Sequence, residues 1–208
     1  MKYYPAFIDL HEREAVVVGG GNVAERKVRA LIRAGASVKV ISPHLTENLT
    51  KLKRKGLLKH IRRNYRRGDL RGAFIVIAGT SSVLTNERIA ADARNLVNVI
   101  DVPTQGNFIV PSVVSRGKLT IAISTGGASP AVSKAIRKEM EKLYGKEFDR
   151  YLRFLETIRK KASAKITDTK TRNAFLKSLA SEELLTMLRS KGFLAASRAI
   201  TASLDRLL

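Results

Sequence analysis

Three consecutive glycines, Gly19 to Gly21, stand between an apolar run and a helical pattern near the start of the chain. Together with Ala24 they fit the pattern G-x-G-x-x-A. In this pattern the first glycine permits a tight turn, and the second lets a pyrophosphate approach backbone N–H groups at the start of a helix, where the helix dipole favours anions. A glycine turn with a structural role alone is the alternative. The flanking strand and helix patterns favour a dinucleotide site at Gly19 and Gly21.

The end of the next strand pattern lacks the residue that usually distinguishes NAD from NADP. An acidic side chain is expected about 20 positions after the glycines, where it would bind the ribose 2′-hydroxyl. The sequence there reads Ser42-Pro43-His44, with neither a carboxylate nor an arginine for a 2′-phosphate. Ser42, or the backbone at Pro43 and His44, could bind the ribose instead, so the choice between the two dinucleotides stays open.

Polar residues also follow two later strand patterns. Asp101 comes directly after the apolar run 96–100, and a carboxylate at that edge of a parallel sheet could accept a proton or attract a metal cation. An aspartate close to Pro103 is also common in plain turns. Thr80 follows the strand pattern 73–78, and we expect it near the nicotinamide or the ribose.

A second loop combines glycines with hydroxyl side chains. Residues 124–130 read STGGASP and precede a helical pattern, which predicts Ser129 as the N-cap and Pro130 as the first helical residue. The N–H groups at such a helix start can bind carboxylates. Ordinary capping plus a glycine turn is the alternative, and both can hold together. The candidate substrate contacts in this loop are Ser124, Thr125, Gly126 and Gly127.

These candidates depend on an alternation of strand and helix patterns, which predicts a parallel sheet with right-handed crossovers. The expected strands are 15–18, 37–41, 60–65, 73–78 and 96–100, and the expected helices are 22–34, 46–55 and 85–94. Further strands are expected at 108–110, 112–115 and 119–124, with a hairpin turn at Arg116-Gly117 and then a helix from Pro130 to about Tyr144. From Lys146 onward the pattern is helical only, with breaks near Asp168, Ser181 and Gly192.

The composition limits the possible partners. Lys and Arg number 39 against 18 Asp and Glu, which gives a net charge of +21 and favours anionic partners. The segment 51–71 is the most basic, and we interpret it as a solvated surface, with nucleic-acid binding as the less favoured alternative. There is no cysteine, and the three histidines are scattered, so no metal site is predicted. The absence of a long apolar run and of a signal sequence predicts a soluble cytoplasmic protein.

Four blocks of this sequence resemble the siroheme-synthase dehydrogenase family. They are PAFIDL at 5–10, VVGGGNVAERK at 17–27, NVIDVP at 98–103 and ISTGGASP at 123–130, and their order and spacing agree with the family across about residues 3–143. The resemblance implies an α/β protein with a Rossmann-like NAD-binding domain at 1–111, a small β-hairpin and helix dimerisation module at 112–145, and an all-helical C-terminal domain at 146–208.

The resemblance also implies an activity and residue roles. Family members oxidise precorrin-2, a tetrapyrrole rich in carboxylates, to sirohydrochlorin with NAD⁺. Asp101 is then the catalytic residue, and the nucleotide contacts fall on Asn22-Val23 and Pro43-His44, so the missing acidic residue is no departure from the family. Some members also insert Fe²⁺ into sirohydrochlorin, and the sequence does not decide whether this chain inserts Fe²⁺ or Co²⁺.

The resemblance implies an intertwined homodimer, and the residues of the predicted module support one. A module of about forty residues is too small to bury its own apolar side chains, namely Val113, Val114, Ile121, Ile123, Val132, Ile136, Met140 and Leu143. A rival interpretation is a nucleotide-sensing regulatory module without catalysis. Such a module would share the glycine turn but would need neither Asp101 nor the 124–130 loop.

Overall fold

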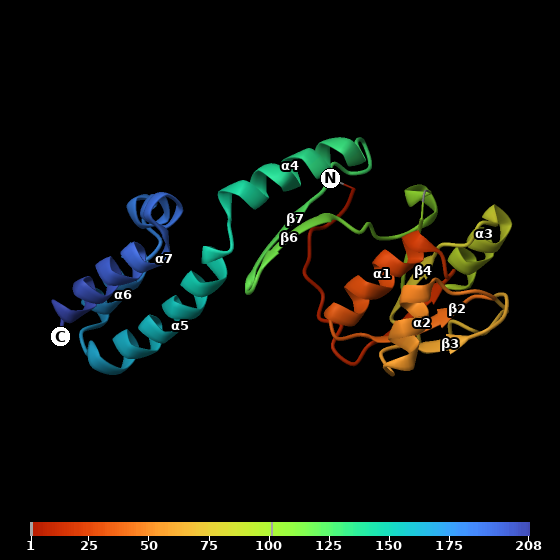
Figure 1. The fold of residues 1–208 in the computed structure, drawn as a ribbon, viewed down its shortest axis with the longest axis horizontal. Coiled ribbons are helices and arrows are strands. Elements are labelled where there is room, and N and C mark those ends of the chain that lie inside the picture. Colours follow the sequence, from red (N-terminus) through yellow and green to blue (C-terminus); the bar gives the residue numbers. More distant parts are fainter. Residues whose placement is uncertain (1, 101) are drawn as a thin grey trace. The chain divides into compact units, whose positions relative to one another are not determined.

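The computed structural model describes residues 2–100 and 102–208. It divides into two compact units, Met1–Val110 and Pro111–Leu208, and each is treated by itself. The two units are drawn in Figure 1. The finer division of the second unit at residue 145 stays a prediction. None of the helices in the described part of the chain is long and apolar enough to cross a membrane.

The first unit is built on a parallel sheet of five strands in the order β3-β2-β1-β4-β5. The reversal of strand order between β1 and β4 makes their carboxyl ends the place where ligands bind in such sheets. The parallel sheet predicted from the alternating patterns and the Rossmann-like fold implied by the resemblance are therefore confirmed. The strands are β1 (Glu14–Val18), β2 (Ser37–Ile41), β3 (Lys59–Ile61), β4 (Ile75–Ala78) and β5 (Leu96–Val99).

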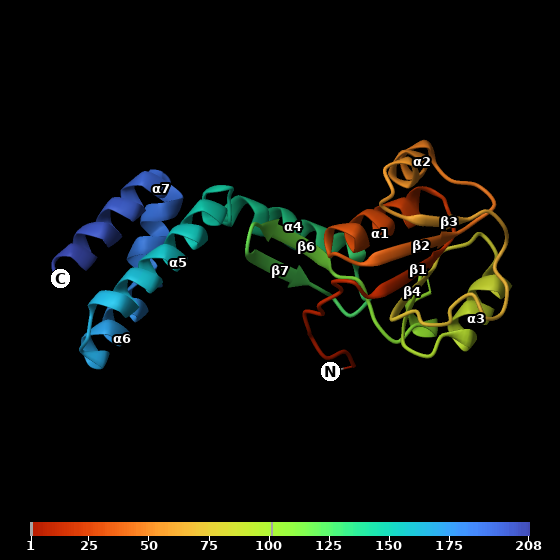
Figure 2. The same ribbon diagram turned by 90° about the horizontal axis from the view of Figure 1, so that it is seen from below.

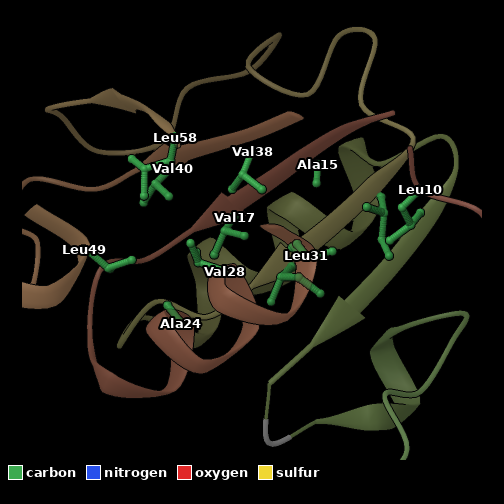
Figure 3. Packing of buried hydrophobic residues seen from close by; sticks show 12 residues of the cluster. Leu10, Ala15, Val17, Ala24, Val28, Leu31, Val38, Val40, Leu49 and Leu58 are labelled. Atoms are coloured by element: carbon green, nitrogen blue, oxygen red, sulfur yellow. The ribbon is translucent and has the colours of Figure 1, made fainter. Parts of the chain in front are cut away.

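Helices cover both faces of this sheet, as Figure 2 shows. On one face, α1 (Asn22–Arg33) and α2 (Glu47–Arg54) pack over Val17 and Val40; on the other, α3 (Val83–Asp92) packs over Val16 and Val18. Successive residues of β1 point to opposite faces, which explains why its run of valines is buried throughout. Figure 3 shows the first of these two cores.

Three sequence predictions differ from the structure in this unit. The third strand ends at Ile61 rather than Tyr65, and α3 begins at Val83 because the Ser82 hydroxyl caps it by accepting from Thr85 N. The strand predicted at 108–110 is wrong. Phe108 O in this segment accepts from Asn98 Nδ2 at 3.1 Å, so a side-chain amide provides the partner that a paired strand would otherwise supply.

The second unit begins with an antiparallel hairpin and ends in helices. The hairpin strands are β6 (Ser112–Arg116) and β7 (Leu119–Ile123), followed by α4 (Pro130–Leu143), α5 (Glu147–Lys165), α6 (Thr169–Ser178) and α7 (Glu182–Asp205). The breaks predicted by sequence are confirmed, since Asp168 and Ser181 are N-caps and Gly192 has a left-handed φ of 79° inside α7. A separate core holds the tail helices together around Phe148, Tyr151, Phe175 and Leu188.

Candidate functional site

The turn between β1 and α1 requires glycine at its first position. Gly19 has a φ of 123°, which side chains rarely adopt, and its N–H donates to Ile41 O at 2.9 Å. A Cβ atom on Gly19 would lie 2.2 Å from Gly79 O, so the turn also packs against the loop that follows β4. Gly79 is itself crowded, because a Cβ there would lie 2.5 Å from Ile100 Cδ1.

The middle glycine has a steric role that sequence reasoning missed. A Cβ on Gly20 would lie 2.0 Å from His44 O and 2.8 Å from Ser42 Oγ. Gly20 O also accepts a hydrogen bond from Thr46 N at 3.1 Å. The sequence did carry a sign of this role, because the motif requires glycine only at positions 19 and 21, yet position 20 is also glycine.

The third glycine faces open space at the start of α1. A Cβ on Gly21 would meet nothing within 4 Å, and Gly21 as N-cap gives the helix no side-chain hydrogen bond. By contrast, side chains cap α2, α3, α4, α6 and α7. Asn22 and Val23 in the first turn are exposed, while Ala24 is buried against the sheet. Free N–H groups and open space at a helix start fit a dinucleotide pyrophosphate.

The loop after β2 lies against this turn. Ser42 is buried, whereas Pro43 and His44 are exposed. Ser42 N donates to Ile61 O at 3.2 Å, and Ser42 O lies 2.8 Å from His60 Nε2. The structure thus brings the predicted ribose contacts beside the glycines, through the contacts of Gly20 with Ser42 and His44 described above.

An ionic cluster fixes the two turns to each other. The Thr46 hydroxyl donates to Glu25 Oε2 at 2.7 Å, and Arg29 Nε donates to Glu25 Oε1 at 2.9 Å. The Thr46 hydroxyl, and after it Arg29, hold the pKa of the Glu25 carboxyl below its ordinary value against the opposing effect of burial. Because this carboxylate is already hydrogen-bonded to the scaffold, it holds α1 beside α2.

Thr80, the predicted nicotinamide or ribose contact, lies in the β4–α3 loop that packs against Gly19. The backbone of Thr80 exchanges two hydrogen bonds of 3.1 Å with the buried Asn86 side chain. Its hydroxyl lies 2.8 Å from Asn86 Oδ1 and 3.1 Å from Ser82 O. Sequence reasoning missed Asn86, which looks like any polar helix residue until its burial is seen. Asn86 therefore fixes the backbone of Thr80 at the ligand edge.

Asp101, the predicted catalytic residue, lies outside the described residues, so its role stays a prediction. The chain does reach the ligand edge immediately before it. Val99 is paired with Ala78 in the parallel sheet, and Ile100 N donates to Ala78 O at 2.9 Å.

The loop of predicted substrate contacts belongs to the second unit. Ser129 caps α4 by accepting from Val132 N at 3.2 Å, as predicted. Thr125 Oγ1 bonds to the Ser129 backbone, and Ser124 Oγ accepts from Gly126 N at 3.0 Å. Gly126 and Gly127 face open space. These contacts order the loop, and its binding of substrate stays a prediction.

The described residues contain no group of three or more His, Asp or Glu side chains placed to hold a metal ion.

Two family models match consecutive parts of the chain. One, described as "Putative NAD(P)-binding", matches residues 6–112, and the other, described as "Sirohaem biosynthesis protein central", matches residues 116–143. A solved structure titled "SirC, precorrin-2 dehydrogenase" aligns with a TM-score of 0.79 and 26% identity, over 95% of this chain and 100% of that chain.

Curated relatives agree with the family models. The siroheme synthase of Actinobacillus succinogenes is 32% identical over 209 residues, which cover 99% of this chain and 44% of that protein. The siroheme synthase of Methylobacillus flagellatus is 37% identical over 178 residues, which cover 84% of this chain and 38% of that protein. The chain thus spans less than half the length of these relatives. Because the first family model covers more than half of the chain and the second follows it closely, the chain belongs to the NAD(P)-binding siroheme-synthase family.

Proposed function

We propose that this chain is an NAD-dependent precorrin-2 dehydrogenase, which oxidises precorrin-2 to sirohydrochlorin in siroheme biosynthesis. The observation that carries the proposal is the open, uncapped start of α1 at the ligand edge of the sheet. It occurs in a chain that aligns along its length with a structure named for that activity. The curated siroheme synthases support the same pathway.

The residues of the first unit divide the binding of the dinucleotide between them. The N–H groups of Asn22 and Val23 bind the pyrophosphate, because they stand at the positive end of the helix dipole. Ser42, Pro43 and His44 hold the adenosine ribose. Thr80 contacts the nicotinamide half from the neighbouring loop. Bound NAD⁺ supplies an acceptor for a hydride from the macrocycle.

Asp101 is the proposed general base. Removing two hydrogens from the macrocycle releases one as a proton, and a carboxylate beside the nicotinamide can accept it. The assignment is supported by the family resemblance of the segment 98–103 and by its position after β5 in the sequence. The N–H groups and hydroxyls of the loop from Ser124 to Gly127 would bind carboxylates of the tetrapyrrole.

The second unit is the proposed dimer interface. Val113 on β6, and Val132 and Leu143 on α4, have 43%, 49% and 45% of their surface exposed. Covering these side chains with the same surface of a second copy would give a two-fold symmetric homodimer.

The test is an anaerobic incubation of the purified chain with freshly made precorrin-2 and NAD⁺. We expect the absorption spectrum of sirohydrochlorin to appear only when both NAD⁺ and the protein are present. Binding of NAD⁺ without any turnover would favour the nucleotide-sensing alternative. A second incubation, with sirohydrochlorin and Fe²⁺ or Co²⁺ but no nucleotide, tests whether the chain also inserts a metal.

A further inference from the structure

Two arginines leave the carboxyl end of β3, and their surroundings differ. Arg63 is half-buried, and its guanidinium forms a two-pronged bond to Asp69, with both N–O distances 2.7 Å. Arg62 is exposed, and within residues 2–100 and 102–208 it makes no hydrogen bond or ion pair through its side chain. The Arg63 guanidinium therefore stabilises the loop through Asp69, and the Arg62 guanidinium is available to a ligand.

The sheet places Arg62 next to the loop that would bind the adenosine ribose. In the parallel pairing of β2 with β3, Ile41 is opposite Ile61. The residues that follow are Ser42 and Arg62, and Ser42 N donates to Ile61 O across the pair. His60 Nε2 adds a second link to Ser42 O at 2.8 Å. Arg62 thus starts one strand away from Ser42, at the same edge of the sheet.

The charge around this position is strongly positive. The segment 51–71 contains ten Lys and Arg residues and one acid, Asp69. The Arg63 guanidinium holds the pKa of Asp69 below its ordinary value, so this carboxylate stays ionised and paired. Residues 42–46 contain no acid, and Glu47 follows only after the Thr46 cap. The carboxylate that would bind a ribose 2′-hydroxyl and repel a 2′-phosphate is therefore missing.

We propose that this site accepts a 2′-phosphate on the adenosine ribose, with Arg62 as the residue that binds it. The chain then uses NADP⁺ as well as NAD⁺. The proposal rests on the dinucleotide site proposed above. A phosphate monoester carries between one and two negative charges at neutral pH, and the planar guanidinium matches its oxygens with paired N–H donors. The hydroxyl of Ser42 and the positive field of the neighbouring arginines add to this attraction.

The test is calorimetric titration of the wild-type chain and of two variants, Arg62→Gln and Lys59→Gln. Lys59 is the matched control because it is exposed at the opposite end of the same short strand. Its substitution by Gln removes one positive charge, as the substitution of Arg62 does. Each protein is titrated with NAD⁺ and NADP⁺, and then with 5′-ADP and 2′,5′-ADP, which isolate the adenosine half.

We expect the wild-type chain to bind NADP⁺ at least as tightly as NAD⁺, and 2′,5′-ADP more tightly than 5′-ADP. Arg62→Gln should weaken the binding of both 2′-phosphorylated ligands by about tenfold or more, the scale of one charge-assisted hydrogen bond. Its affinity for NAD⁺ should stay within about twofold. Lys59→Gln should shift all four affinities by less than about twofold, because a solvated charge at the other edge of the sheet is screened.

Three results would overturn the proposal. Wild-type protein that binds NAD⁺ but not NADP⁺ would show that the site excludes the phosphate. An equal loss for NAD⁺ and NADP⁺ in Arg62→Gln would show that Arg62 contacts a part common to both ligands, such as the adenine ring. Binding of neither dinucleotide by the wild-type chain would overturn the proposed function, and this inference with it.

Discussion

At the scale of single residues, the three glycines of the β1–α1 turn have three different roles. Gly19 supplies a left-handed backbone, Gly20 leaves room for the His44 carbonyl, and Gly21 leaves room for a ligand. Only the third position faces outward. The functional consequence of a side chain therefore depends on which of the three glycines receives it.

Gly21→Asp adds a side chain and a negative charge where the pyrophosphate must approach. Because a Cβ at Gly21 meets nothing within 4 Å, we expect the fold to survive and NAD⁺ affinity to fall by about a hundredfold or more, combining steric exclusion with charge repulsion. Calorimetric titration measures the affinity. Gly56→Asp is the control for the added charge, since Gly56 also faces open space but follows α2 at the other edge of the sheet. Its φ of 71° lies in the left-handed region, which aspartate tolerates better than most side chains, and a thermal melt of this variant measures the strain. Unchanged NAD⁺ affinity in Gly21→Asp would contradict the assignment of this turn.

Asp101→Asn keeps the volume of the side chain but cannot accept a proton at neutral pH. If Asp101 is the general base, kcat should fall by about 10²-fold or more, the usual scale for that role. NAD⁺ affinity should barely change, because the pyrophosphate binds at α1. Steady-state kinetics and a thermal melt on the same preparation separate the alternatives. A lower Tm with near-normal turnover would mean that Asp101 is only a turn residue.

At the scale of elements, hydrogen bonds join the β1–α1 turn to the β2–α2 turn. Thr46 N donates to Gly20 O, and the Thr46 hydroxyl donates to Glu25. Thr46 also caps α2 by accepting from Leu49 N. A single residue therefore joins the β1–α1 glycine turn, the start of α2 and the first turn of α1, which fixes the surface where the adenosine would lie.

Gly20→Ala should disrupt the contact between the two turns. The added Cβ would lie 2.0 Å from the His44 carbonyl oxygen, so the 42–46 loop would have to move. We expect a loss of about 1–3 kcal/mol in the free energy of unfolding, the usual cost of overpacking. Urea denaturation measures it. Gly21→Ala is the control, since its added Cβ enters open space at an ordinary φ of −83°. Equal stability of the two variants would show that the loops are not held together as described.

The sheet was predictable from sequence because its strands are short apolar runs buried on both faces. The runs at Ala15–Val18 and Ile75–Ala78 contain no polar residue, and each is followed by a turn residue and a helical pattern. The start of α3 was not predictable by periodicity, because its first two residues, Val83 and Leu84, are 61% and 69% exposed. Helix prediction from periodicity assumes that apolar side chains face the core, and these two exposed residues do not follow that pattern.

The candidate site was predictable only in part. Local patterns identified Gly19, Gly21 and the Ser42–His44 loop, since each follows a strand at the ligand edge. Arg62 could not be recognised, because the predicted third strand continued to Tyr65 and left Arg62 inside it. The actual strand ends at Ile61, and that short edge strand is specified by its pairing with β2 rather than by its own polar sequence.

At the scale of the whole molecule, the second unit leaves apolar surface uncovered around the hairpin and α4. Val114 and Ser133 are the residues of β6, β7 and α4 that are buried within the described chain. The tail helices, by contrast, enclose a core of eleven buried residues. The tail helices thus bury their apolar side chains among themselves, whereas the hairpin and α4 leave many of theirs exposed.

Val132→Glu should prevent dimerisation, because it would bury an unpaired charge in the proposed interface. Light scattering at micromolar concentration should give about twice the 22.9 kDa chain mass for the wild type and a single chain mass for the variant. Leu194→Glu is the control, because Leu194 is even more exposed, at 65%, but belongs to the tail helix α7. A monomeric wild-type protein would contradict the dimer.

The contact between Gly19 and Gly79 limits which substitutions the fold tolerates at this edge of the sheet. A side chain at position 19 would strike a backbone oxygen, which cannot be trimmed by another substitution. A side chain at position 79 would strike only the tip of Ile100, which a shorter residue would remove. Position 19 is therefore closed to change, while positions 79 and 100 can vary as a pair. Gly19, Gly79 and Ile100 are distant in the sequence but pack against one another at the ligand edge. A substitution at one of these positions therefore depends on the residues present at the others.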